Sequence, residues 1–409
     1  MAIDIDADRF RETFETYSAI GATDAGGLHR LALSDADREA RDLLYDQMEA
    51  LDLDVRVDEL GNMFGRREGT DPDAAPVVIG SHLDSQPSGG RYDGQLGVLT
   101  ALETLRAFDD AGVETDRPVE LVNWTNEEGS RFEQAMLGSG VAAGAVDVDH
   151  ALSLEDGEGR SVAAELERIG YAGDDPARVE EAAAYLELHV EQGPKLENEG
   201  LSVGVVDGVF GLNWMEATIE GQANHAGPTA MHDRQDALVA ATNAAGEIHD
   251  LPNRLSEDAV ATVGRMDVSP NSINVIPSEV TFTVDVRSYD DDVVSSAHED
   301  VEFEVATACE REGVDYEFEQ LWSIDPLEFS PVVRDAVAAG AESAGVPYRH
   351  MISGAGHDAN YMAQVTESGM VFVPSVDGIT HAESEFTEWD DCVAGARTYA
   401  NATLELATT

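Results

Sequence analysis

The chain has 409 residues, of which 82 are acidic and 24 basic, so its formal net charge is −58. A surface this negative repels phosphate backbones and anionic lipids, and we therefore expect neither a nucleic-acid nor a membrane partner. No apolar run approaches membrane-spanning length and the N-terminus is acidic, so we expect a cytoplasmic protein without a secretory leader.

The basic residues are almost all arginine. Lys195 is the one lysine, which leaves 23 arginines among the 24 basic residues. This composition resembles that of proteins from a high-salt cytoplasm, and we predict that the fold needs molar salt to screen its self-repulsion. Cys309 and Cys392 are far apart in the sequence and predict neither a disulfide framework nor a thiolate metal site. A length above about 250 residues predicts two domains.

The first elements along the chain predict the start of an α/β layer. We expect an amphipathic helix over 36–52, short strands over 53–57 and 62–66, and a buried strand over 77–81. His82 and Asp84 follow the buried strand, at the edge where open α/β sheets bind ligands. The glycine-rich bend from Gly89 to Gly94 predicts a tight return that brings Asp93 to the same edge, before helical periodicity continues to Ala107.

Two further strands also end in candidate metal ligands. The apolar run 119–124 leads to Glu127 and Glu128, and the run 184–190 contains His189. With His381 near the C-terminus, the candidates are three imidazoles and three carboxylates: His82, Asp93, Glu127, Glu128, His189 and His381.

This donor set fits a centre of two divalent ions. Two ions that share one bridging carboxylate need about this many donors, and one carboxylate is then left to act as a base. Asp93 is the expected bridge, and the Asp84 carboxylate is expected to accept a hydrogen bond from the free ring nitrogen of His82. Mixed imidazole and carboxylate ligands suit Zn²⁺ or Mn²⁺ and also accept Co²⁺ or Ni²⁺.

The expected order of strands and helices changes near Gly211. We expect strands and helices in the order βαββαβ, over 212–221, 233–250, 260–268, 278–287, 290–312 and 314–322. This order is typical of a ferredoxin-like unit. We therefore expect an α/β catalytic domain of residues 1–211 and 326–409, with a mixed, mainly parallel sheet between helices. We expect residues 212–325 to form an inserted lid domain, after which a helix resumes near Pro331.

Specific strings surround these candidates along nearly the whole chain. They are Gly80-Ser81-His82-Leu83-Asp84-Ser85, Gly89-Gly90 to Asp93-Gly94, Asn126-Glu127-Glu128-Gly129, Glu187-Leu188-His189-Val190-Glu191-Gln192-Gly193-Pro194, Asn224-His225-Ala226-Gly227-Pro228, Asn274-Val275-Ile276-Pro277, Asp285-Val286-Arg287 and Gly354 to Asp358. Together they resemble the N-carbamoyl-L-amino-acid hydrolase and allantoate amidohydrolase family of hydantoinase/carbamoylase-type amidases. This family lies within the two-metal aminoacylase and exopeptidase superfamily, whose zinc-exopeptidase-like fold the resemblance implies. One departure is Ala382-Glu383 after His381, where the family often has Ser-Pro or Asn-Pro.

The resemblance implies a role for each candidate. One metal ion is expected on His82, Asp93 and His189, and a second on Asp93, Glu128 and His381. Glu127 is implied to be the general base that takes a proton from the attacking water and returns it to the departing nitrogen.

Further residues are implied to contact a small anionic ureido substrate. His225 and Asn274 would stabilise the oxyanion, Arg287 would bind the carboxylate, and Gln192 would touch the ureido group. Gly356 and His357 are also candidates for substrate contact, although the same stretch is compatible with a simple helix cap. In this family the lid histidine can come from the neighbouring subunit, which implies a homodimer.

Several alternatives remain open on the sequence. The favoured substrates are N-carbamoyl-L-amino acids, but allantoate and β-ureidopropionate also place a ureido group near a carboxylate, and the pocket beside Arg287 is the expected discriminator. An aminopeptidase or deacylase would use the same metal pair, typically with a carboxylate in place of His189. A catalytically inactive binding protein would be expected to lack Glu127 or a ligand, and all are present.

Overall fold

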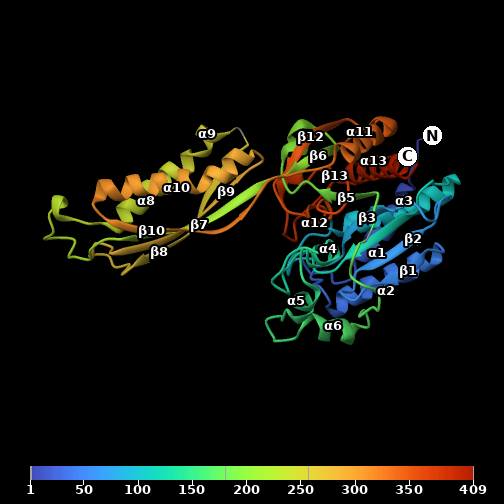
Figure 1. Cartoon of the computed structure of the whole chain (residues 1–409), viewed down its shortest axis with the longest axis horizontal. Helices are drawn as coiled ribbons and strands as arrows, with labels where there is room; N and C mark the ends of the chain where they lie inside the picture. The colour runs from blue at the N-terminus through green and yellow to red at the C-terminus, as the bar shows by residue number, and fades with distance from the viewer. Residues whose placement is uncertain (1, 180, 257, 409) are drawn as a thin grey trace. The chain divides into compact units, whose positions relative to one another are not determined.

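A computed structural model describes residues 2–179, 181–256 and 258–408. The chain divides into two compact units, the first formed by Met1–Asp207 with Phe329–Thr409 and the second by Gly208–Glu328. Both units combine helices with a sheet, as Figure 1 shows, which confirms the α/β class. Within the described ranges, no helix is both long and apolar enough to span a bilayer.

A mixed sheet forms the centre of the first unit. In spatial order its strands are β1 (Asp54–Val57), β2 (Met63–Arg67), β4 (Val119–Trp124), β3 (Val77–His82), β5 (Ala184–Val190), β13 (Ser368–Val373) and β6 (Val203–Val209), with β11 (Leu327–Glu328) and β12 (Tyr348–Ser353) also paired to β6. The four strands from β4 to β13 run parallel, and the pairs β1–β2, β2–β4 and β13–β6 are antiparallel. The four parallel strands are buried along their whole length, because helices cover both faces of a parallel sheet.

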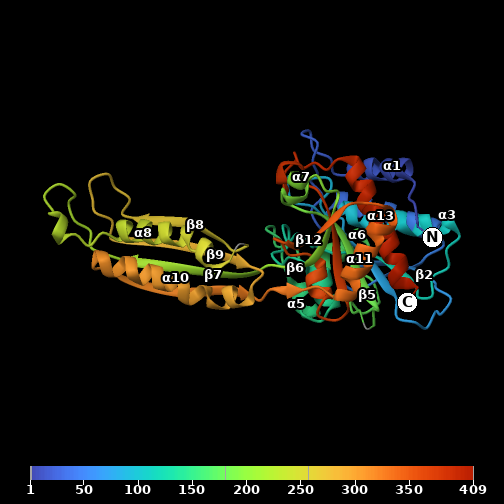
Figure 2. The same ribbon diagram turned by 90° about the horizontal axis from the view of Figure 1, so that it is seen from above.

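Strand β5 shows which helices cover which face, because successive side chains of a strand point to opposite sides. The Leu188 side chain lies next to Gly395 of α13 (Trp389–Ala407), and its backbone carbonyl lies next to Gly97 of α3 (Gln95–Ala111). On the other side, Glu187 accepts a hydrogen bond from Ala359 N of α12 (Asp358–Met362), at 3.0 Å. Figure 2 shows the same unit from above. The other helices of this unit are α1 (Ala7–Ser18), α2 (Asp35–Ala50), α4 (Leu137–Ala142), α5 (Val148–Ser153), α6 (Val162–Ile169), α7 (Lys195–Glu199) and α11 (Pro331–Ala344).

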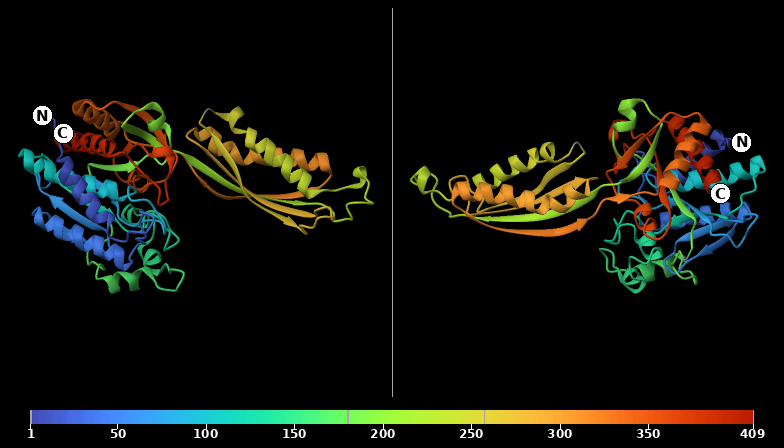
Figure 3. Two further views of the ribbon diagram at one scale, coloured as in Figure 1. Left: turned by 180° about the vertical axis from the view of Figure 1, so that it is seen from behind. Right: turned by 45° about the horizontal axis from the view of Figure 1, so that its top comes forward.

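The second unit contains a four-stranded antiparallel sheet. Its spatial order is β10 (Asp315–Ile324), β7 (Gly211–Glu220), β9 (Glu279–Ser288) and β8 (Val260–Ser269). Helices α8 (Ala237–Asp250) and α10 (Asp291–Glu312) pack on one face, as both views in Figure 3 show, and α9 (Pro252–Leu255) follows α8. This βαββαβ arrangement is that of a ferredoxin-like unit. Val280, Phe282 and Val284 are buried on β9, whereas the alternate residues, including Asp285 and Arg287, are only partly buried on the face without helices.

The expected start of the helix at residue 233 is wrong. Residues Met231–Asp233 form a short 3-10 turn, and Gln222 N donates to Gln235 O, which holds this segment extended. The helix begins at Ala237 because the Asp236 side chain accepts from Leu238 N and Val239 N and caps it.

Candidate metal centre

Two histidines lie side by side at the carboxyl ends of parallel strands. His82 ends β3 and His189 lies near the end of β5, and these strands pair in parallel. Each ring uses its Nδ1 in a 3.0 Å hydrogen bond to a backbone carbonyl, His82 to Asp84 O and His189 to Val190 O. Both Nε2 atoms point toward Asp93 as potential metal ligands. Among the residues that the structure describes, the buried Nε2 of His82 has no hydrogen-bond partner, and that of His189 accepts a 3.3 Å bond from Gly94 N.

Asp93 lies between these histidines and a second group of side chains. Its Oδ1 is 3.4 Å from His82 Nε2 and 3.1 Å from His189 Nε2. Its Oδ2 is 3.6 Å from His381 Nε2, which in turn is 3.5 Å from Glu128 Oε2. The structure thus gathers two potential metal-binding groups, His82–Asp93–His189 and Asp93–Glu128–His381, with Asp93 common to both.

The spacing of these donor atoms fits divalent ions. Bonds of about 2.0–2.1 Å in a tetrahedral site place neighbouring ligand atoms roughly 3.4 Å apart, which is close to the separations around Asp93. The partnerless Nε2 of buried His82 supports the same interpretation, because buried polar atoms normally have a partner. The donors are imidazoles and carboxylates, a set that several divalent metals accept.

Glu127 also faces the first group, with its Oε2 3.6 Å from His82 Nε2. Its backbone is held by Asp84, whose carboxylate accepts hydrogen bonds from Glu127 N at 3.2 Å and Glu128 N at 3.3 Å. The expected bond from His82 to the Asp84 carboxylate is therefore wrong. The nearest carboxylate oxygen is 3.8 Å from Nδ1, because the carboxylate is engaged by the two loop amides and the ring donates to the Asp84 carbonyl instead.

The carboxyl groups of the site differ in their acidity. Burial raises the pKa of Glu127 well above its ordinary value, and nearby Asp358 and Glu128 add to this effect. Burial and Asp93 also raise the pKa of Glu128 to about 8. Burial opposes ionisation of Asp93 as well, but His189 and His82 outweigh it and hold its pKa well below the ordinary value. Asp93 is therefore the most readily ionised of these three carboxyl groups.

Unusual backbone conformations cluster around the site. Asn126, Gln192 and His381 have positive φ angles of 56°, 59° and 51°, a region that side chains other than glycine rarely occupy. Asn126 is held by bonds from its Nδ2 to Phe132 O and Gln134 O. Gly94, with φ 62°, has no room for a side chain, because a Cβ there would lie 2.2 Å from the His82 ring.

Gln192 and His357 also lie beside the two candidate ligand groups. Gln192 Nε2 donates to Asp93 Oδ2 at 2.9 Å and to Thr380 Oγ1 at 3.2 Å. His357 is the N-cap of α12, and its buried ring lies 4.5 Å from the ring of His189, centroid to centroid. Burial and the neighbouring His189 lower the pKa of His357 well below its ordinary value, which favours the neutral ring. Gly356 precedes it, next to the Met136 side chain.

One buried acid at this centre was not predicted from the sequence. Glu385 Oε1 accepts from Tyr92 N and Asp93 N, and its Oε2 accepts from Thr380 Oγ1. Burial, followed by repulsion from Asp93, raises its pKa to about 7. Its only sequence signal is the spacing from His381, which does not distinguish it among 82 acidic residues.

The remaining candidates lie in the second unit. His225 and Asn274 are on neighbouring loops, which are joined by bonds from Ala226 N to Asn274 O and from Ile276 N to Asn224 O, both 2.9 Å. Arg287 lies on β9 and pairs with Asp285, with 3.0 Å between Nη2 and Oδ2.

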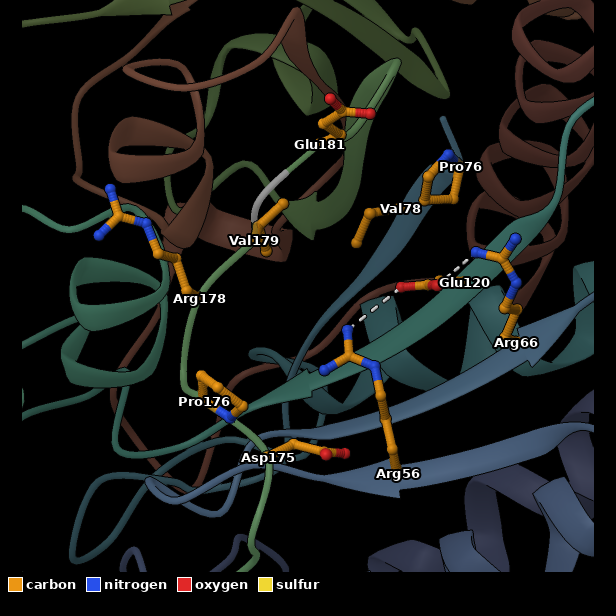
Figure 4. Close-up of a pocket in the computed structure, with 10 residues that line it drawn as sticks. All are labelled: Arg56, Arg66, Pro76, Val78, Glu120, Asp175, Pro176, Arg178, Val179 and Glu181. Carbon is orange, nitrogen blue, oxygen red and sulfur yellow. Dashed lines mark hydrogen bonds and ion pairs between the residues drawn. The ribbon is translucent and has the colours of Figure 1, made fainter. Parts of the chain in front are cut away.

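A separate hollow of about 560 Å³ lies at the opposite edge of the large sheet, where β3 and β4 begin. Figure 4 shows that Arg56 and Arg66 both point to Glu120, at 3.4 and 2.9 Å. Arg178, Asp175 and Glu181 also line the hollow, so its acidic and basic groups balance. We assign it no role in the chemistry.

Residues 78–405 match the family model described as Peptidase family M20/M25/M40, and the chain belongs to this family. An N-carbamoyl-L-amino-acid amidohydrolase of Rhizobium meliloti is 42% identical over 403 residues, covering 98% of this chain and 97% of that protein. An allantoate amidohydrolase of Escherichia coli is 32% identical, covering 97% of each. A crystal structure of an amidase of the hydantoinase/carbamoylase family from Burkholderia multivorans is 45% identical with a TM-score of 0.96, covering 100% of this chain and 99% of that one. These similarities confirm the family expected from the motifs.

Proposed function

We propose that this protein is a divalent-metal-dependent amidohydrolase that cleaves the carbamoyl C–N bond of N-carbamoyl-L-amino acids, giving the amino acid, CO₂ and ammonia. The observation that carries the proposal is the position of Asp93, whose two oxygens face two separate groups of ligand atoms. A carboxylate shared in this way is typical of two-metal hydrolases. The names of similar proteins favour carbamoyl amino acids, with allantoate as the alternative.

The proposed ligands are His82, Asp93 and His189 for one ion and Asp93, Glu128 and His381 for the other. Zn²⁺ or Mn²⁺ suits these donors, and Co²⁺ or Ni²⁺ is also compatible with them. When bound, such ions polarise the substrate carbonyl and lower the pKa of the attacking water.

Glu127 is the proposed general base. Its Oε2 lies beside the first ligand group, and its raised pKa makes the carboxylate a better proton acceptor near neutral pH. It takes a proton from the attacking water and returns it to the departing nitrogen. Asp84 fixes the loop amides of Glu127 and Glu128, and so determines where both carboxylates point.

Six further residues are proposed to contact the substrate. His225 and Asn274 donate to the oxyanion that forms at the carbamoyl carbon, and Arg287 binds the substrate carboxylate through its guanidinium fork. Gln192 contacts the ureido group, with its amide already 2.9 Å from Asp93. Gly356 and His357 complete the substrate contacts.

The surface beside Arg287 favours an apolar substrate side chain. Trp214 pairs with Asp285 across the strands, next to the pair of Leu212 with Arg287. Trp214 and Trp322 pack edge to face at 5.2 Å and remain 39% and 48% exposed. Together with Leu321 they offer an aromatic and apolar surface, and a hollow of about 250 Å³ lies there. The second ureido group of allantoate would instead need polar partners at this position.

We also propose that the second unit acts as a lid and dimerisation domain in a cytoplasmic homodimer, with His225 supplied by the neighbouring chain. The loops that carry His225 and Asn274 also expose Met231 and Ile273, the latter fully. Exposed apolar side chains beside functional candidates are typical of an interface. Sedimentation equilibrium in molar KCl should give twice the chain mass, and a single-chain mass would contradict this part of the proposal.

The substrate assignment is tested by product release in molar KCl with added Mn²⁺. Ammonia is measured with N-carbamoyl-L-phenylalanine, N-carbamoyl-L-methionine, β-ureidopropionate and allantoate, and acetate is measured with N-acetyl amino acids. We expect turnover of the carbamoyl amino acids, with kcat/KM reduced in Trp214→Ala. Turnover of allantoate alone would overturn the assignment in favour of the alternative. Acetate release alone would indicate an aminoacylase.

A further inference from the structure

Glu385 connects the two loops that carry ligands of the second group. Its side chain is only 4% exposed. Oε1 accepts from Tyr92 N at 3.0 Å and from Asp93 N at 3.1 Å, and Oε2 accepts from Thr380 Oγ1 at 3.2 Å. Thr380 immediately precedes His381, so a single carboxylate holds the backbone of Asp93 and the loop of His381 together.

The bend before Asp93 is shaped around this carboxylate. A Cβ at Gly90 would lie 2.0 Å from Glu385 Oε1, which leaves no room for any side chain. The glycine at this position therefore lets the loop close over Glu385 and present its amides to it.

We propose that Glu385 is a positioning residue that keeps Asp93 shared between the two ligand groups. This inference rests on the proposed two-metal centre. Asp93 can serve both ligand groups only if its Oδ1 faces His82 and His189 while its Oδ2 faces His381. This orientation of the carboxylate depends on a fixed Asp93 backbone. Groups that orient metal ligands typically change metal affinity by 10- to 100-fold when they are removed.

The two ligand groups depend on Glu385 to different degrees. His82 and His189 lie on buried central strands, and each ring is fixed by its own bond to a backbone carbonyl. His381, by contrast, lies on a loop with a 47% exposed side chain, and its neighbour Thr380 is tied to Glu385. Removal of Glu385 should therefore weaken the group of Glu128 and His381 more than the group of His82 and His189.

The test is calorimetric titration of metal-free protein with Mn²⁺ in molar KCl. Wild type should bind two Mn²⁺ ions. Glu385→Ala should bind one ion with the wild-type affinity, whereas its affinity for the other ion should fall by at least about tenfold. Glu385→Gln should restore most of the lost affinity, since its carbonyl oxygen still accepts from Tyr92 N and Asp93 N. Glu383→Ala, two residues away on the same loop, serves as the matched control and should resemble wild type. As a spectroscopic readout, magnetic coupling between the two Mn²⁺ ions should disappear from the electron paramagnetic resonance spectrum of Glu385→Ala and return in Glu385→Gln.

The outcomes separate this inference from the proposed function. Two unchanged affinities in Glu385→Ala would overturn the positioning role, and so would an equal loss at both sites. If Glu385→Ala fails to fold, Glu385→Asp decides, because its shorter side chain cannot span both loops and should also lose the second affinity. A wild-type protein that binds no Mn²⁺ would instead contradict the two-metal centre itself.

Discussion

Glu127 is the residue on which the proposed proton transfer depends. Its carboxylate is next to His82 Nε2, but it belongs to neither of the two ligand groups. Glu127→Gln should therefore retain bound metal and fold while kcat falls by about 10²–10⁴-fold, the range for loss of a general base. Glu133→Gln, an exposed position on the same loop, is the control. Full activity in Glu127→Gln would remove it from the mechanism.

Arg287 should act on binding rather than on the chemical step. Arg287→Ala removes a charged fork that fits a carboxylate, and hydrogen bonds to charged groups contribute about 1.5–3 kcal/mol. KM for N-carbamoyl amino acids should rise about 10- to 100-fold with little change in kcat. Arg265→Ala, at an exposed arginine on β8, should leave KM unchanged. An equal KM in the two variants would exclude contact between Arg287 and the substrate.

The loop after β4 is held by buried ion pairs. Arg131 lies three residues after Glu128 and pairs with Asp156 at 3.0 Å and with Glu165. Burial opposes ionisation of Asp156, but bonds from Arg160 N and Glu158 N and the Arg131 side chain together lower its pKa to about 2. This network fixes the loop that presents the two glutamates of the site.

The lowered pKa of Asp156 predicts a pH-dependent contribution to stability. The ionised side chain stabilises the folded state above the ordinary carboxyl pKa, and this contribution is lost as the pH falls toward 2. Asp156→Asn should lower the free energy of unfolding by about 1–2 kcal/mol at pH 7, after allowance for solvent screening. The difference from wild type should shrink below pH 4. This difference in the free energy of unfolding is measured by urea unfolding in molar KCl at several pH values. Asp174→Asn, at an exposed position, is the control. A difference that stays constant down to pH 3 would contradict the assignment.

The strands that lead to the candidate metal ligands could be predicted, because the sequence pattern of each strand is local. Strands β3, β4 and β5 are short apolar runs followed directly by polar residues, and the structure places them within a residue of the expected bounds. Strands β6, β12 and β13 were not predicted. A short apolar run such as that of β13 has no periodicity that separates a buried strand from a buried helix.

Hydrogen-bond partners within the site were harder to predict than the residues themselves. Two-residue spacing places Asp84 near His82, but it does not reveal that loop amides compete for the same carboxylate. Glu385 is 292 residues from Asp93 in the sequence, and only the folded chain brings them together. Contacts of this kind depend on tertiary packing, for which a single sequence carries no direct signal.

The formal net charge of −58 dominates the electrostatics of the folded chain. Mutual repulsion of like charges favours the unfolded chain, and ions within a Debye length of about 3 Å at 1 M salt screen it. The thermal midpoint should therefore fall on dialysis from molar KCl into dilute buffer at pH 7. A midpoint that is independent of salt would contradict the predicted salt requirement.

In the proposed centre, Asp93 serves two metal ions. This shared role is tested most directly by the metal content of wild type, Asp93→Ala and His381→Ala after exposure to Mn²⁺ and gel filtration in molar KCl, with folding checked by circular dichroism. We predict two ions per chain in wild type, one in His381→Ala and none retained in Asp93→Ala. Two ions retained in folded Asp93→Ala, or a single ion in wild type, would contradict a carboxylate shared between two metal ions.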